Sequence, residues 1–240
     1  MPTLTIRALP TALAAIASIA ISLICTSVAC ADDPLSNDVR IGSYSVFYHV
    51  NASDLSGPFI PAGENLNFHP EDIETLYFAY LRRLSPHFTF ELAMGVPPVA
   101  KTKGRGPLDL GSVPYNDQVL STVRWFAPTG FIEYNFLPES SPVRPFIGVG
   151  VNYTYFYDRT STGPGDAVSG GPTKISLPAS VGPAATVGLT WRPAPRWNFT
   201  ASYSGSKVNA RLTADTAGEI RTSHIEFNPT ALIISVGLSF

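Results

Sequence analysis

Two acidic side chains are the first candidates for chemistry in this chain. Glu91 and Glu133 each lie in a stretch where large apolar residues occupy every second position, and each falls between those residues. A period of two places the two sets on opposite faces of a β-strand. Both carboxylates therefore point away from the apolar face, into an interior. Buried carboxylates need partners, and we expect Arg144, Arg124 or Arg82 to supply them.

Inward carboxylates of this kind have two possible roles. In the first, ion pairs pack together and plug the interior. In the second, the charged groups form a polar ring that a permeating solute must pass. The sequence leaves both roles open.

The other reactive side chains do not form a recognisable catalytic or metal-binding arrangement. None of the four histidines has metal-ligand spacing with another: His49, His69, His87 and His224. Ser223 and His224 could be a hydrolase pair that modifies lipid, but adjacent residues of a strand face opposite ways. We therefore predict a non-enzymatic protein with no catalytic residues, no metal site and no cofactor.

The N-terminus is typical of an export signal. Arg7 precedes an apolar run at residues 12–25, and residues 29–31 (Ala-Cys-Ala) form a small-x-small cleavage site. We predict a cleaved signal peptide at 1–31 and a mature chain at 32–240. The alternatives are an uncleaved membrane anchor and a lipoprotein signal at Cys30.

Composition narrows the class of protein. Both cysteines lie in the predicted signal, and charged residues make up only 14% of the chain, against about 25% in ordinary soluble domains. No apolar run after Asp32 is long enough for a membrane-spanning helix. The formal net charge of −2 gives no basis for nucleic-acid binding. Few charges with many aromatic, Gly and Pro residues favour strands.

Eight segments show the alternation of a strand. The clearest is 143–157, where Ile147, Val149 and Val151 alternate with Gly148 and Gly150. The eight are 39–50, 73–84, 88–94, 118–136 (interrupted at Pro128), 143–157, 181–191, 197–208 and 230–240.

The connections between these segments alternate in length. Three are short and contain proline, whereas four are long and polar: 51–72, 95–116, 158–176 and 211–223. This is typical of an outer-membrane barrel with short periplasmic turns and longer extracellular loops. We predict an all-β, eight-stranded antiparallel up-and-down transmembrane barrel with four loops, three turns and both termini in the periplasm.

A soluble eight-stranded barrel of the lipocalin kind is the competing fold. Its outer face would carry Lys, Glu, Asp and Arg, whereas the polar face of strands 143–157, 181–191 and 197–208 is nearly uncharged. Small residues suit the crowded interior of a narrow barrel. Large aliphatic and aromatic side chains are then expected to face lipid, a group that includes the set Tyr44, Val46 and Tyr48 in the first strand.

Three segments resemble the OmpW family of small outer-membrane proteins. Residues 144–158, RPFIGVGVNYTYFYD, resemble the family strand RPYxGxGxNYTxFxD. Residues 227–240 are similar to its ending, xxPxxxxxxxGYxF, with Gly237-Leu238 in place of Gly-Tyr. Residues 39–42 are similar to its first-strand xRxG.

The resemblance implies an eight-stranded barrel in a Gram-negative outer membrane, with a narrow and largely apolar interior. It also implies passage of small hydrophobic molecules, and in some members a receptor role for phage or bacteriocins. The segment 158–176 shows no helical period, which weakens any inference about functions that depend on the loops.

We predict a porin-like conduit for passive passage of small hydrophobic solutes. The alternative is a non-conducting structural or adhesive barrel that acts through its loops. Expected partners are outer-membrane lipid and the barrel assembly machinery, with Phe240 as the assembly signal. The predicted channel-lining residues are Glu91, Glu133, Arg144, Asn152, Thr154 and Phe156. Missing ladder donors predict a lateral opening at Pro97, Pro98 and Pro128.

Overall fold

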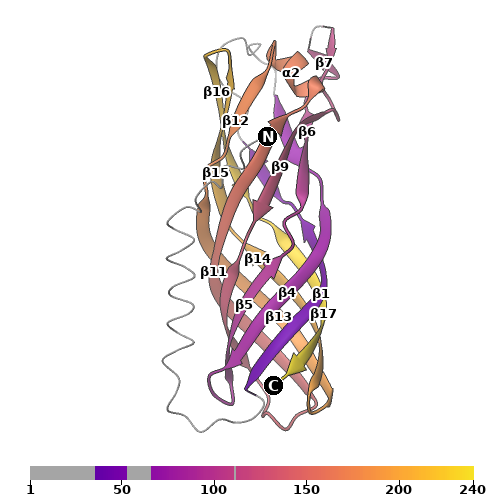
Figure 1. Ribbon diagram of the computed structural model, residues 1–240, viewed down its shortest axis with the longest axis vertical. Coiled ribbons are helices and arrows are strands. Elements are labelled where there is room, and N and C mark those ends of the chain that lie inside the picture. Colours follow the sequence, from indigo (N-terminus) through magenta and orange to yellow (C-terminus); the bar gives the residue numbers. More distant parts are fainter. Residues whose placement is uncertain (1–35, 53–65, 111) are drawn as a thin grey trace, which may run out of the picture. The chain divides into compact units, whose positions relative to one another are not determined.

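Eight strands form a closed antiparallel barrel (Figure 1), which confirms the predicted fold class. The computed structural model describes residues 36–52, 66–110 and 112–240. The predicted signal peptide lies outside these residues. The barrel strands, in order around the wall, are β1 (Asn37–Phe47), β4 (Ile73–Arg83), β5 (Phe88–Gly95), β10 (Thr129–Asn135), β11 (Val143–Ser161), β13 (Ser180–Ala194), β14 (Trp197–Ser206) and β17 (Thr230–Ser239).

The first and last strands close the barrel. They pair antiparallel from Asp38 opposite Ser239 to Phe47 opposite Thr230. Beyond this ladder, Asn37 and Phe240 exchange two backbone hydrogen bonds of 3.0 and 2.8 Å. A closed ladder satisfies the backbone polar groups that hydrocarbon cannot. We call this end, which also holds the links after β4, β10 and β13, the short-turn end, and the opposite end the long-strand end.

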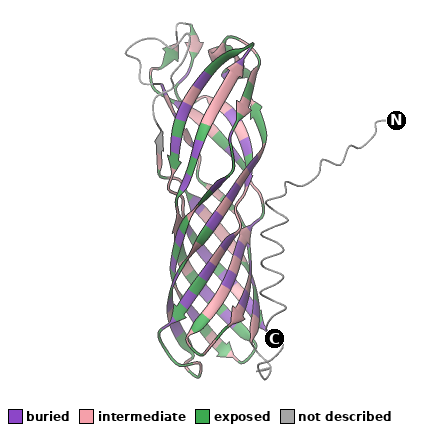
Figure 2. Ribbon diagram, turned by 90° about the vertical axis from the view of Figure 1, so that its left-hand side faces the viewer, coloured by how far each residue is buried: buried purple, intermediate pink, exposed green. Residues whose placement is uncertain are grey.

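The two faces of the wall differ as the alternation predicts (Figure 2). On β11, Val149 and Val151 are 68% and 58% exposed on the outer face, while Asn152 and Thr154 are buried on the inner face. Trp191 and Trp197, beside the turn between β13 and β14, also point outward and are about half exposed. This arrangement gives the barrel an apolar belt that is stable in lipid.

Seven of the eight wall strands are interrupted at one height, which we call the break level. Only β11 continues through it, with a register shift between Tyr157 and Thr160 and a positive φ of 47° at Asp158. The interruptions are at residues 48–49, 71–72, 96–98, 127–128, 177–179, 207 and 228–229. The break level divides the lumen into a short-turn half and a long-strand half.

Beyond the break level the wall continues as strands, so much of the four segments predicted as long loops is in β-strand. One sheet has the order β12–β15–β16–β2, and β3, β6 and β9 extend the wall from the outer part of β11. The further strands are β2 (Val50–Ala52), β3 (Asn67–Pro70), β6 (Val99–Arg105), β7 (Asp109–Leu110), β8 (Val113–Pro114), β9 (Val119–Phe126), β12 (Thr173–Ser176), β15 (Val208–Thr216) and β16 (Glu219–Phe227).

The segment 158–176 also differs from prediction, because it contains a short helix, α2 (Gly163–Ser169). Thr162 caps its N-terminus, since its hydroxyl accepts a 3.2 Å hydrogen bond from Gly165 N. Gly170 ends the helix in the left-handed conformation, at φ 81°. The helix has seven residues, about two turns, and is too short to show a helical period in the sequence.

Candidate functional site

The lumen of the short-turn half is filled by a charged network. Arg40 forms a 3.5 Å ion pair with Glu91, and its Nε and Nη2 donate to Asn198 and Thr190 over 3.3 and 3.4 Å. The Tyr77 hydroxyl donates to the other oxygen of Glu91 over 2.6 Å. Strands β1, β4, β5, β13 and β14 supply these groups, and all of them are buried.

Further groups extend the network toward the short-turn end. Asp38 Oδ2 accepts 3.4 Å contacts from Arg192 and from Asn198, whose side chain is fully buried. Glu133, 2% exposed, is close enough for its charge to act on Arg40, and its Oε1 has no hydrogen-bond partner in the part of the chain that the structure describes. A lumen filled in this way presents charge and no apolar path.

The predicted partners of the two carboxylates were wrong. Arg144 donates instead to the carbonyl groups of Pro86 and Leu137, over 2.6 and 3.3 Å. Arg124 pairs with Asp158 outside the lumen, and Arg82 donates to Asn37. The cation is Arg40. Its signal was present in the first strand, where it stands between the outward-facing Val39 and Ile41.

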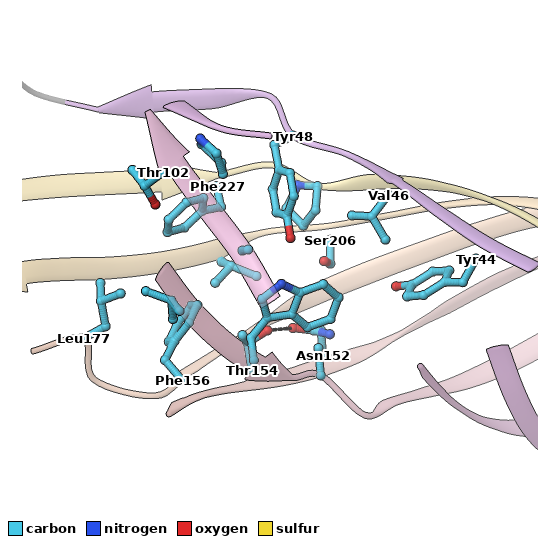
Figure 3. A pocket seen from close by; sticks show the side chains of 17 residues that line it. Tyr44, Val46, Tyr48, Thr102, Asn152, Thr154, Phe156, Leu177, Ser206 and Phe227 are labelled. Carbon is cyan, nitrogen blue, oxygen red and sulfur yellow. Dashed lines mark hydrogen bonds between the residues drawn. The ribbon is translucent and has the colours of Figure 1, made fainter. Parts of the chain in front are cut away.

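At the break level the lumen opens into a mostly apolar cavity (Figure 3). Tyr48 directs its hydroxyl into this space, and Phe156, Leu177 and Phe227 surround it. The other lining residues are Tyr44, Val46, Pro70, Ala100, Thr102, Val123, Trp125, Ala127, Asn152, Thr154, Ser206, Val208 and Pro229. We call this space the central cavity.

The predicted lining residues therefore separate into two groups. Asn152, Thr154 and Phe156 lie together in the central cavity. Asn152 accepts a hydrogen bond from Thr154 over 2.7 Å (Figure 3) and donates one to Thr129 over 2.8 Å, so both polar groups of its side chain are paired. Glu91, Glu133 and Arg144 lie on the other side of the break level.

The expectation that Tyr44, Val46 and Tyr48 face lipid was wrong, because all three line the central cavity. The lipid-facing set of β1 is the odd-numbered one, which includes Val39, Ile41 and Phe47 at 44%, 47% and 39% exposed. An eight-stranded barrel is narrow, yet it widens enough at the break level to hold aromatic rings. Alternation fixes which residues share a face but does not show which face is inside.

The wall has an unpaired seam beside this cavity, which we call the proline notch. Pairing of β5 with β10 ends at Ala93 opposite Thr129, and pairing of β6 with β9 begins at Val99 opposite Arg124. Between these two ladders lie Pro97, Pro98 and Pro128, which lack backbone N–H donors.

Each edge of the proline notch bonds away from the seam. On one edge, Val96 N donates to Leu76 O and Val96 O accepts from the Thr75 hydroxyl, both over 2.9 Å. On the other edge, Pro128 O accepts from Tyr153 N over 3.0 Å. Met94 and Ala127 line a further part of the lumen just inside. Along the notch, the two neighbouring segments of the wall therefore share no ladder hydrogen bonds.

Comparison with known proteins decides the family. Residues 39–240 match the sequence profile of the OmpW family. The chain belongs to the OmpW family. This OmpW-family protein is 30% identical over 113 residues to outer membrane protein W of Vibrio cholerae, an alignment covering 47% of this chain and 51% of the relative.

A second relative is named after a metabolic operon. The dibenzothiophene metabolism operon protein PahQ of Pseudomonas aeruginosa is 32% identical over 123 residues, covering 50% of this chain and 52% of that protein. The chain thus spans about half the length of these curated relatives. The crystal structure of the outer membrane protein OprG from Pseudomonas aeruginosa superposes with a TM-score of 0.75 at 18% identity, covering 85% of this chain and 95% of OprG.

These findings identify an outer-membrane barrel, and the matched family is not an enzyme family. The candidate pair Ser223 and His224 is divided by the wall, since Ser223 is 2% exposed inside and the His224 side chain is 57% exposed outside. Within the described ranges, no group of three His, Cys, Asp or Glu residues could hold a metal ion. No helix in the described ranges is long and apolar enough to cross a membrane.

Proposed function

We propose that this OmpW-family protein is a passive conduit for small hydrophobic molecules across the outer membrane. The central cavity carries this proposal, because a lumen wall of aromatic and aliphatic side chains binds apolar solutes weakly and without directional bonds. In this proposal the long-strand end faces the outside, and the short-turn end with both termini faces the periplasm.

The charged network determines where such a solute leaves. Moving an apolar molecule through the ion pairs around Arg40 would separate buried charges, which costs several kcal/mol per ion. The proline notch opens beside the cavity, at a level where no ladder hydrogen bonds need to break. We therefore propose that the solute passes sideways through the notch into the membrane. The name of the relative PahQ points to fused aromatic compounds as one class of solute.

Uptake of a hydrophobic aromatic probe tests the proposal in cells that contain or lack the protein. Ala100→Trp places an indole inside the central cavity, whereas Lys101→Trp places the same group on the exposed outer face of the same strand. We expect Ala100→Trp to reduce uptake to that of cells without the protein, and Lys101→Trp to leave it unchanged. Equal uptake with both variants would contradict the proposal.

A second arm tests the lateral exit. Replacing Pro97, Pro98 and Pro128 with valine restores three backbone donors, and we expect slower uptake because the seam can then pair. Pro178→Val is the matched control, since Pro178 interrupts a different part of the wall. Unchanged uptake in the triple variant would exclude the proline notch as the exit.

A structural or adhesive barrel is the second candidate function. Leu108, beside β7, and Ile220, in β16, are 75% and 54% exposed in the long-strand half. Apolar groups there favour contact with a partner. Loss of ligand capture, with normal uptake, in a Leu108→Ser and Ile220→Ser variant would support this role.

A further inference from the structure

A second chamber lies deeper in the long-strand half, between the two sheets that extend the wall. Helix α2 contributes to its lining and contacts β8, β9 and β12 (Figure 1). Its apolar walls include Phe68, Leu120, Ile175 and Leu212. We call this space the outer chamber.

One charged side chain, Arg221 on β16, lines the outer chamber. Arg221 is 6% exposed. Its Nη2 donates to Ser169 O over 3.4 Å and to the Thr216 hydroxyl, while its Nε has no hydrogen-bond partner among the described residues. A buried guanidinium normally pairs with an anion, so this one has capacity left.

Nearby carboxylates do not supply that anion. Asp166 Oδ1 accepts from Thr173 N over 3.1 Å, and Asp215 Oδ1 accepts from Gly218 N over 2.9 Å. Burial lowers the pKa of Arg221, and no acidic residue in the described ranges offsets this effect. The contrast with Arg40 is direct, because four acidic or phenolic groups surround Arg40.

The other polar side chains that line the chamber are short, and they suit hydrogen bonding to an anion held by Arg221. Ser121 and Ser161 line the same space as Arg221, whereas the Thr173 hydroxyl already donates to Gly171 O over 3.0 Å. A carboxylate accepts several hydrogen bonds at once, and guanidinium is the group that binds it in a bidentate manner. The apolar walls leave room for a hydrocarbon body beside the charged group.

We propose that the outer chamber binds small apolar carboxylates, aromatic or aliphatic, with the acid group on Arg221 and the hydrocarbon against Leu120, Ile175 and Leu212. The assignment of such acids as passengers rests on the proposed conduit function, whereas the binding site itself does not. A solute that enters from the long-strand end would then be selected by its acid group in the outer chamber and by its apolar part in the central cavity.

Binding to the full barrel in lipid nanodiscs tests the site, by ligand-observed NMR titration with benzoate. Benzyl alcohol is the neutral counterpart of the same size, and inorganic phosphate carries charge without an apolar body. We expect benzoate to bind at least roughly 10-fold more tightly than either, the effect of one or two hydrogen bonds to a charged group.

Two matched variants locate the effect. Arg221→Gln should weaken benzoate binding by roughly 10- to 100-fold and leave benzyl alcohol unchanged. Arg211→Gln removes an equal charge from the exposed face of the adjacent strand and should change neither. Heat-modifiable gel migration verifies that each variant is folded.

Benzoate binding that is no tighter than that of benzyl alcohol, or that survives Arg221→Gln, would overturn the proposal. Equal competition by phosphate would also overturn it, since the walls would then play no part. Binding through Arg221 in a protein that fails the uptake test supports the site while the conduit is rejected. Uptake without Arg221-dependent binding rejects this inference alone.

Discussion

The two halves of the lumen share strand β11 and are filled in opposite ways. In the short-turn half, Arg40, Glu91 and Asp38 belong to a packed network. In the long-strand half, aromatic and aliphatic side chains surround a cavity, and Arg221 forms no ion pair with an acidic residue in the described part of the chain. The same barrel thus holds a charged, filled segment and a mostly apolar, open segment, because different strands supply the inward side chains on the two sides of the break level.

Among the substitutions that test the contrast between the two halves, we expect the largest effect at Arg40. Arg40→Met leaves Glu91 and Glu133 in the lumen without their nearest cation. We expect a loss of about 3–5 kcal/mol in the free energy of unfolding, as for other broken buried pairs. Urea unfolding in lipid vesicles, followed by tryptophan fluorescence, measures it.

Arg124→Met is the matched control, since its ion pair with Asp158 is 48% and 67% exposed. We expect a change of about 0–1 kcal/mol there. Equal losses in the two variants would mean that the network does not hold the short-turn half together.

Substitution of Gly150 tests how closely neighbouring strands of the wall pack beside the central cavity. A methyl group at this position would collide with the Gly130 carbonyl oxygen and with the Phe131 ring. We expect Gly150→Ala to cost about 1–3 kcal/mol, the usual effect of overpacking. Thermal migration shifts on gels measure the change.

Gly130→Ala is the partner variant on the neighbouring strand. Its methyl group would lie 3.8 Å from the Phe90 ring, an ordinary contact. We expect a change within about 0.5 kcal/mol. A large cost here as well would indicate general sensitivity of the wall rather than a narrow point at Gly150.

The smallest expected effect concerns Lys103 in the long-strand half. Lys103 donates hydrogen bonds to Glu71 and Asp117, both at 3.0 Å, and these bonds raise the pKa of Lys103 above its ordinary 10.5. The ammonium form is favoured by folding, so this contribution to stability is complete below pH 10.5 and disappears as the pH rises through the raised pKa.

Thermal midpoints of the wild-type protein and Lys103→Gln, measured as the pH rises, should therefore converge at alkaline pH. The difference before convergence should be small, because exposed ion pairs are weak. Curves that stay parallel at every pH would show that the charge of Lys103 contributes nothing.

Alternation allowed the sequence to predict most of the barrel. The strand predicted at 143–157 is found at Val143–Ser161, and the terminal strand at Thr230–Ser239. Its limit appears in the first strand, where Arg40 and Tyr44 share the inner face although one is charged and the other aromatic. Which of two such sets faces inward depends on closure with β17 and β4, which are distant in sequence.

The residues of the candidate site were harder to predict than the strands, because some of their contacts join elements that are distant in sequence. Asn152, Thr154 and Phe156 follow one another on a single strand, and their shared cavity could be predicted from that strand alone. The Arg40–Glu91 pair joins residues on β1 and β5, which do not pair directly. The hydrogen bonds that hold Arg221 come from Ser169 of α2 and Thr216 of β15, and local composition did not indicate that either element would form.

Strand β11 is the single wall strand that runs unbroken past the break level. Every other connection between the halves passes through a linker of one to three residues. The ladder hydrogen bonds of the short-turn half and of the long-strand half are therefore separate along seven strands and continuous along β11. We expect amide exchange to show two separate protection plateaus, with continuous slow exchange along β11 alone.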